Sequence, residues 1–250
     1  MTVYPRNRLL GALPQNDYSR ISPTLTPIPF PFKQTFHKEG EPIERIIFPS
    51  SGVASLVNVM ADGRMVEVAT VGNEGALGSS VFLGGDIALA DSFVQVAGDP
   101  ETAALSMSSA AFKSEVQRHG AFYDIVGRYS QALQALIMQS AACNVLHSVE
   151  ERCARWLLMT HDRVTGNDIY LTHEFLGMML GARRPTVSVV LGTLHKAGLI
   201  QNTTKKIVIV DRRGLEAASC ECYETVRSTF DRLLPRSRHE SSQWTSRVVR

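Results

Sequence analysis

Hydrophobic residues recur with helical spacing over residues 171–200. On either side of Gly181 they lie three and four positions apart, which is the spacing of one helix face. Thr172 is a good N-cap for the first of these segments. Pro185 falls in the first turn of the second, where its missing N–H costs nothing. The pattern predicts two short helices joined by a tight turn at Gly181.

Two short apolar runs follow, Leu199–Gln201 and Ile207–Val210, separated by a polar stretch from Asn202 to Lys206. They predict a β-hairpin. Two short helices joined by a turn that contains glycine form a helix-turn-helix, and a hairpin directly after it is a wing. A helical hairpin with a solvated basic end, followed by an ordinary surface turn, is the alternative. The complete order of helix, turn, helix and hairpin favours a DNA-binding module.

In a DNA-reading helix-turn-helix, the start of the second helix meets base edges in the major groove. The tip of a wing can contact the phosphate backbone. The residues expected to contact DNA are therefore Thr172, Arg183, Arg184, Pro185, Thr186, Ser188, Val189, Lys196, Lys205 and Lys206.

Apolar and polar residues alternate in short runs between about residues 32 and 105. Asp62-Gly63 separates two such runs, and Asp-Gly in this position is a strong hairpin signal. Short strands at spacings of roughly ten residues predict a β-barrel or β-roll. Short helical pieces precede this region, in residues 5–22.

A longer helix is predicted over residues 121–147, with apolar positions at alternating spacings of four and three. This is the seam of a two-stranded coiled coil. The alternative is a helix that packs on its own β-domain. With a DNA-binding module following it, we expect a dimer helix. The expected dimer contacts are Phe122, Val126, Tyr129, Leu133, Leu136, Ser140 and Cys143.

The C-terminal pattern resembles the DNA-binding domain of the Crp/Fnr superfamily of bacterial transcription regulators. The matching features are LT at the first helix, LG before the turn, R-x-T-V opening the second helix, and GLI before the wing. More weakly, FPSSGVASL and VGNEGALGSSVF resemble the family's cyclic-nucleotide-binding β-roll. The resemblance implies an α+β fold with an N-terminal β-roll, a long central dimerisation helix and a C-terminal winged helix-turn-helix. It also implies a transcription regulator that binds near-palindromic double-stranded DNA as a homodimer.

The family's base-reading positions fall on Arg184, Pro185 and Val189, where its best-known members carry Arg, Glu and Arg. Only the first is kept, so one guanine contact is retained. The usual acceptor for cytosine N4 is missing, and Val189 offers a surface for a thymine methyl instead. Arg183 is expected to hold a phosphate rather than read a base.

The family's phosphate-binding cassette corresponds here to the stretch that begins at Gly75. Ala76 stands in place of the family's Glu, and Ala90-Asp91 stands about where an Arg-Ser pair is expected. A buried phosphate without a cation is costly, so we expect no cyclic-nucleotide binding in the family's way. The alternative is a regulator that responds to a cyclic nucleotide or another small molecule through a divergent pocket. Its pocket residues would be Gly75, Ala76, Leu77, Ala90 and Asp91.

Four cysteines are too few for a disulfide framework in a chain of 250 residues. Cys143 and His147 lie four positions apart and could form half of a metal site or a thiol pair across a dimer. Because no second ligand pair is apparent, we interpret them as small and polar residues at a hinge. Cys220 and Cys222 are interpreted as unpaired thiols. No metal or cofactor is predicted.

The charge distribution supports a two-part chain. Residues 1–120 hold 9 Lys/Arg against 12 Asp/Glu, and residues 148–250 hold 16 against 11. This suits a sensor-like β-roll domain (1–120) joined by the dimerisation helix (121–147) to a nucleic-acid domain. The winged helix-turn-helix is expected over 148–213, followed by a C-terminal helix and a disordered basic tail (214–250).

An apolar content of 44% and a charged content of 20% are those of a globular protein. No apolar run is long enough for a membrane span, and the N-terminus lacks a secretory pattern, so a cytoplasmic protein is expected. An enzyme with an accessory DNA-binding module is the least favoured class, because no catalytic constellation stands out. RNA polymerase is a further candidate partner, and any small-molecule effector is unknown.

Overall fold

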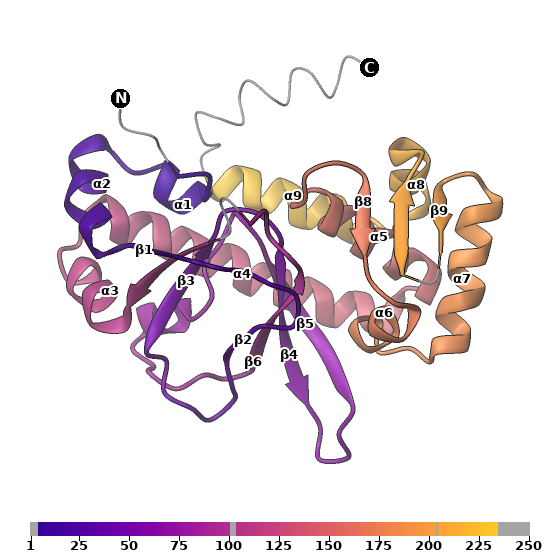
Figure 1. Cartoon of the computed structure of the whole chain (residues 1–250), viewed down its shortest axis with the longest axis horizontal. Helices are drawn as coiled ribbons and strands as arrows, with labels where there is room; N and C mark the ends of the chain where they lie inside the picture. The colour runs from indigo at the N-terminus through magenta and orange to yellow at the C-terminus, as the bar shows by residue number, and fades with distance from the viewer. Residues whose placement is uncertain (1–4, 101–103, 204, 235–250) are drawn as a thin grey trace.

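The computed structural model describes residues 5–100, 104–203 and 205–234. Figure 1 shows a strand-rich N-terminal half and a helical C-terminal half, with the long helix α4 (Ala121–Leu146) extending along both. None of the described helices combines the length and the apolar character needed to span a membrane. The arrangement confirms the predicted α+β fold.

Two antiparallel sheets form the N-terminal half, with strand orders β1-β7-β3 and β2-β6-β4-β5. Apolar side chains of both sheets, among them Ile47, Val71 and Val94, meet in a buried core. The strands are β1 (Thr26–Ile28), β2 (Thr35–His37), β3 (Arg45–Pro49), β4 (Val53–Val59), β5 (Met65–Val71), β6 (Asp91–Val96) and β7 (Ala104–Ser108). The helices of this half are α1 (Arg8–Gly11), α2 (Gln15–Ile21), the 3-10 turns η1 (Ser22–Thr24) and η2 (Ser79–Leu83), and α3 (Ser109–Val116).

The hairpin predicted at Asp62-Gly63 is present. It joins β4 to β5, with Leu56 paired to Ala69 and one register shift next to that pair. Gly63 has φ +82°, a left-handed conformation that glycine adopts without steric cost. The Asp62-Gly63 turn therefore determines how β4 connects to β5.

The C-terminal half contains five helices and three strands among the described residues. They are α5 (Val149–His161), β8 (Asp168–Tyr170), α6 (His173–Leu180), α7 (Arg184–Lys196), β9 (Ile200–Asn202), β10 (Lys206–Ile209), α8 (Arg212–Ala218) and α9 (Cys222–Leu233). The expected C-terminal helix is thus split in two. Asp211 caps α8 by accepting a hydrogen bond from the N–H of Gly214 at 2.9 Å, and α9 then packs along α4. The predicted basic tail, residues 235–250, lies outside the described residues.

The apolar seam of α4 does not face a second chain. Phe122, Tyr129 and Leu136 are each no more than 2% exposed, and they belong to a core shared with the sheets and with α5. The hydroxyl of Tyr129 donates to the carbonyl of Ala76 at 3.2 Å. The prediction that this seam forms the dimer contact is therefore wrong, because the chain's own core occupies it. The buried positions are Phe122, Val126, Tyr129, Leu136, Ser140 and Cys143, and Leu133 is partly buried.

A buried ion pair joins the two halves. Arg163, just after α5, donates from Nε and Nη2 to the same carboxylate oxygen of Glu74, at 2.9 Å in each case. The two side chains are 9% and 6% exposed. The N–H of Gly72 donates to that oxygen as well, at 3.1 Å. The loop after β5 is thereby attached to the C-terminal half.

A second polar contact ties β5 to α5. Trp156 donates its indole N–H to Glu67 Oε1 at 3.0 Å, and Glu67 Oε2 lies 2.6 Å from the hydroxyl of Ser55. Burial raises the pKa of Glu67 to about 7. The sulfur of Met179 on α6 also contacts the Ser55 hydroxyl, at 3.4 Å. The first helix of the expected DNA-binding module is therefore packed on the β-roll.

We expect Glu74→Gln to destabilise the protein by about 3 kcal/mol, because it leaves the guanidinium of Arg163 buried without a counter-charge. The measurement is the free energy of unfolding in a urea titration at neutral pH. Glu224→Gln is the control, since Glu224 is 60% exposed and pairs with Arg227 at 2.8 Å on the surface, where an ion pair contributes little. Equal stability of the Glu74→Gln and Glu224→Gln proteins would contradict this account.

Candidate nucleic-acid interface

The two predicted helices and their turn are present as α6 and α7. Thr172 caps α6, its hydroxyl accepting a hydrogen bond from the N–H of Phe175 at 3.2 Å. Gly181 ends α6 with φ +58°, a conformation that disfavours any residue with a Cβ. A Cβ on Gly177 would lie 2.8 Å from the carbonyl oxygen of Ala182. Glycine at both positions lets the chain turn this tightly.

One face of α7 is buried and the opposite face is exposed. Val187, Val190, Leu191 and Leu194 are buried, and α7 packs with them against α5 and α6. This is the seam predicted from the sequence. Because a helix with one apolar stripe presents its other residues to solvent, the predicted DNA-contacting positions of α7 are exposed. They are Arg184, Pro185, Thr186, Ser188, Val189 and Lys196, with Arg183 just before the helix also exposed.

The exposed start of α7 carries uncompensated positive charge. Its first turn contains no acidic residue, and Arg183 at the N-cap makes no capping hydrogen bond with its side chain. No carboxylate among the described residues pairs with Arg183 or Arg184. Unsatisfied N–H groups and the helix dipole add positive partial charge at the same place. This end of the helix is suited to an anionic ligand such as a phosphate.

Val189 lies on the same exposed face and is 70% exposed. A β-branched apolar side chain gains nothing from that exposure in the free protein. In a major groove its methyl groups can contact a thymine methyl. The geometry is thus compatible with the role assigned to Val189 from the sequence.

The wing differs from the prediction in having a third strand. β10 pairs with β9 and also with β8, which precedes α6. Lys206 lies opposite Tyr170 in that pairing, and its ammonium bonds the carboxylate of Asp168 at 3.0 Å. That hydrogen bond raises the pKa of Lys206. Lys206 is therefore already paired, whereas Lys205 is exposed at the tip.

His173 is a positioning residue that sequence reasoning missed. Its Nδ1 lies 3.0 Å from the hydroxyl of Ser188 on α7, and its Nε2 lies 3.1 Å from the side-chain oxygen of Asn202 on β9. The imidazole thus links the first helix, the recognition helix and the wing. Ser188, expected to contact DNA, is held by this network. No spacing in the sequence indicates the contact, because the partners are 15 and 29 positions away.

Three of the five positions named for a divergent effector pocket are closely packed by the protein itself. Ala76 and Leu77 are buried, and Leu77 forms a bridge with Ile47. A Cβ on Gly75 would lie 2.5 Å from the hydroxyl oxygen of Tyr129. Tyr129 of α4 thus occupies the space beside Gly75, the first position of the pocket that the alternative interpretation would require.

The two remaining pocket positions are at the start of β6. Ala90 and Asp91 are half-buried. Asp91 accepts a hydrogen bond from the N–H of Glu39 at 2.8 Å, so its carboxylate holds the turn that follows β2. A carboxylate at this position would repel a phosphate, as the sequence indicates.

Comparison with known proteins bears on the same region. Residues 151–218 match the family model of the Crp-like helix-turn-helix domain. No curated protein matches the chain in sequence. Among solved structures, a CRP-family transcriptional regulator of Thermus thermophilus is similar with a TM-score of 0.62 and 20% identity, over 77% of this chain and 96% of that one.

Two further solved structures show the same likeness. FixK2 of Bradyrhizobium japonicum has a TM-score of 0.61 and 19% identity, over 78% of this chain and 98% of that one. The c-di-GMP-responsive global regulator CLP of Xanthomonas campestris has a TM-score of 0.62 and 15% identity, over 78% and 99%. The resemblance to the Crp/Fnr superfamily is thus confirmed, since the chain carries a Crp-like helix-turn-helix domain within the fold of Crp/Fnr transcription regulators.

Proposed function

We propose that this protein is a sequence-specific, DNA-binding transcription regulator that acts as a homodimer on near-palindromic sites. The observation that carries the proposal is the exposed, cationic start of α7 on a Crp-like helix-turn-helix. Such a surface attracts the phosphate backbone, and the helix behind it fits a major groove. Contact with RNA polymerase and a cytoplasmic location stay predictions from the sequence.

Arg184 is the residue proposed to read sequence. It lies at the first position of α7, is exposed, and has no carboxylate partner among the described residues. A free guanidinium can bond O6 and N7 of one guanine together. Arg183 and Lys205 are proposed to hold phosphates on either side of the groove, because both are exposed and flank the recognition helix. Lys206 has a smaller role in this scheme, since Asp168 already engages it.

The homodimer is proposed to form along a partly exposed stripe of α4 that borders α9. Ala135, Met138, Ala142 and Val145 recur at spacings of three, four and three. Met138 is 65% exposed and Val145 is 83% exposed. The stripe has coiled-coil spacing, but each of its residues stands two positions after a residue of the seam predicted on the sequence, so the stripe lies about 160° away around the helix. Pairing two chains along it would present two α7 helices to successive major grooves about 34 Å apart.

The β-roll is proposed to bind no cyclic nucleotide in the family's way. Tyr129 fills the space beside Gly75. Glu74, in the same loop, is committed to Arg163 in the C-terminal half. A phosphate placed here would meet the carboxylate of Glu74 and would have to compete with it for Arg163. One structural relative is responsive to c-di-GMP, so a different small-molecule effector at another place is the second candidate.

Replacing Arg184 and Lys205 separates base reading from phosphate binding. Arg184→Ala should lower affinity for the preferred sequence by about 1–3 kcal/mol and relax specificity at one base pair. Lys205→Ala should weaken binding to all sequences and reduce the salt slope by about 1. The preferred sequence comes from selection on random duplexes, and affinities from fluorescence anisotropy at several salt concentrations. Arg118→Ala, on the far side of the β-roll domain, is the matched control and should change neither quantity. If Arg184→Ala kept the parent's preference at every base, the assigned role would be wrong.

Met138→Glu should convert a dimer to a monomer, because it places a charge in the middle of the apolar stripe. Sedimentation velocity at micromolar concentration measures the result. Leu89→Glu is the control, since Leu89 is 79% exposed on the β-roll and lies outside the stripe. If the Met138→Glu protein sedimented as a dimer like the parent, the stripe would not be the dimer interface.

Isothermal titration of the full chain with cyclic AMP should give no saturable heat. The physical reason is that Tyr129 occupies the space beside Gly75 and that Arg163, the cation nearest this loop, is already paired with Glu74. Titration with c-di-GMP in parallel tests the second candidate. Saturable binding of cyclic AMP would overturn the first proposal for the β-roll and would leave the DNA-binding proposal intact.

A further inference from the structure

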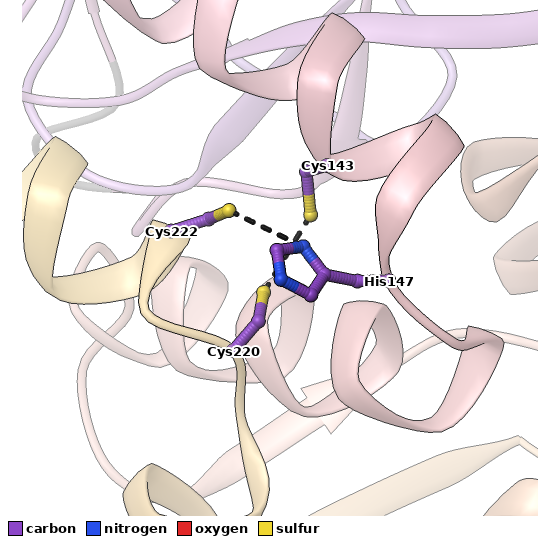
Figure 2. Close-up of side chains that lie close together, drawn as sticks. All are labelled: Cys143, His147, Cys220 and Cys222. Carbon is purple, nitrogen blue, oxygen red and sulfur yellow. Dashed lines mark hydrogen bonds between the residues drawn. The ribbon is translucent and has the colours of Figure 1, made fainter.

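Four metal-ligating side chains converge where α4 meets the segment between α8 and α9. Cys143 and His147 come from the end of α4, one turn apart. Cys220 and Cys222 flank the start of α9. Their donor atoms all lie within 4.8 Å of one another. Figure 2 shows the three cysteine side chains pointing toward the imidazole of His147. Cys143 and His147, interpreted from the sequence as hinge residues, thus form one cluster with Cys220 and Cys222, which were interpreted as unpaired thiols.

The spacing of the donor atoms fits a single ion. Cys143 Sγ lies 3.5 Å from Cys220 Sγ, and Cys222 Sγ lies 3.5 Å from His147 Nδ1. In a tetrahedral site with bonds of about 2.0 to 2.3 Å, neighbouring ligand atoms are about 3.3 to 3.8 Å apart. An iron–sulfur cluster would attach its ligands to different iron atoms and hold them wider apart.

The ligand chemistry selects the kind of ion. Three thiolates and one imidazole form one of the usual ligand sets of structural zinc. Calcium and magnesium prefer oxygen ligands, and no carboxylate belongs to the four donors. Four protein ligands fill a tetrahedral coordination sphere, which is typical of a structural site rather than a catalytic one.

The groups around the ligands support metal binding independently. Nε2 of His147 lies 3.1 Å from a carboxylate oxygen of Glu221. A carboxylate in this position fixes the tautomer with the proton on Nε2, so that the lone pair of Nδ1 points at the sulfurs. Gln139 donates a hydrogen bond from Nε2 to Cys222 Sγ at 3.0 Å, which stabilises a thiolate there.

A disulfide explains the positions of these four side chains less well than a metal ion does. The nearest pair, Cys143 and Cys220, is not bonded, and all four cysteines of the chain are free. A bond between these two would leave Cys222 and the oriented imidazole of His147 without a role. The three clustered thiols are buried in a group of their own, apart from the hydrophobic core. Cys153 is also buried but belongs to that core.

We propose that Cys143, His147, Cys220 and Cys222 bind one Zn²⁺ ion. Binding to the thiol forms would release three protons, one from each cysteine, while neutral His147 coordinates through Nδ1. The ion would link Cys143 to Cys220, which is 77 positions further along the chain, and the segment between them includes the whole winged helix-turn-helix. It would also anchor the start of α9 on α4. The zinc site would thus fix the DNA-binding domain to the long helix.

The test starts from the untagged full chain, purified under reducing conditions without chelator. Elemental analysis by mass spectrometry should find about one zinc ion per chain. Cys222→Ser and His147→Ala should each lose most of the zinc. Cys153→Ala is the matched control, because it removes a buried cysteine outside the cluster, and it should keep the full content.

A second measurement does not depend on the variants folding. Removing the metal from the parent chain with a strong chelator should lower its melting temperature, and added Zn²⁺ but not Mg²⁺ should restore it. Replacement by Co²⁺ should give the intense visible absorption of a tetrahedral thiolate site. A parent chain without bound zinc that also fails to take up Co²⁺, or one with a Cys143–Cys220 disulfide, would overturn the proposal. None of these readouts involves DNA, so they stand or fall separately from the proposed function.

Discussion

The burial of one face of α4 is the constraint on which the two halves of this chain depend. Phe122, Tyr129 and Leu136 lie in one hydrophobic core that includes side chains of the β-roll, α5 and the helix-turn-helix. Such a core is close-packed and resists continuous deformation. The DNA-binding domain therefore cannot swing on α4 as a free module. Any change in its orientation has to repack residues that also hold the sensor-like domain together, so the two domains are mechanically coupled through this helix.

The same constraint accounts for the contacts at the loop where the resemblance places a phosphate cassette. Tyr129 reaches from α4 into the space beside Gly75, and Glu74 in the same loop is paired with Arg163. The contact between domains is thus built from the loop that the resemblance assigns to an effector phosphate. Opening that loop would expose a buried ion pair and empty a space that an aromatic ring now fills. Both events cost free energy, which favours the closed arrangement.

Sequence reasoning found the elements whose causes are local. Thr172 as a cap, Gly181 in a left-handed turn and the Asp62-Gly63 hairpin depend on a few neighbouring residues, and each was predicted. The partner of the α4 seam was not, because spacings of four and three describe a helix face that can pack equally well on a second helix or on a sheet. His173 and the cysteine–histidine cluster were missed for another reason. The partners of His173 are 15 and 29 positions away, the pair Cys143/His147 is separated from Cys220/Cys222 by more than 70 residues, and only the fold brings them together.

The contacts of α4 follow one another in an order that would let a structural change in the β-roll reach the DNA-binding domain. Its first turns pack on the β-roll, and its middle carries the exposed stripe from Ala135 to Val145. Its end carries Cys143 and His147, beside the start of the DNA-binding domain. Since α9 packs along the helix, Ala135 and Ala142 border the groove between the two helices, and a partner chain would reach the stripe beside α9. The position of a second α7 would then follow from helix pairing and from the contacts at the helix end. In the proposed dimer, the spacing of the two α7 helices would thus be set by α4 rather than by the helix-turn-helix itself.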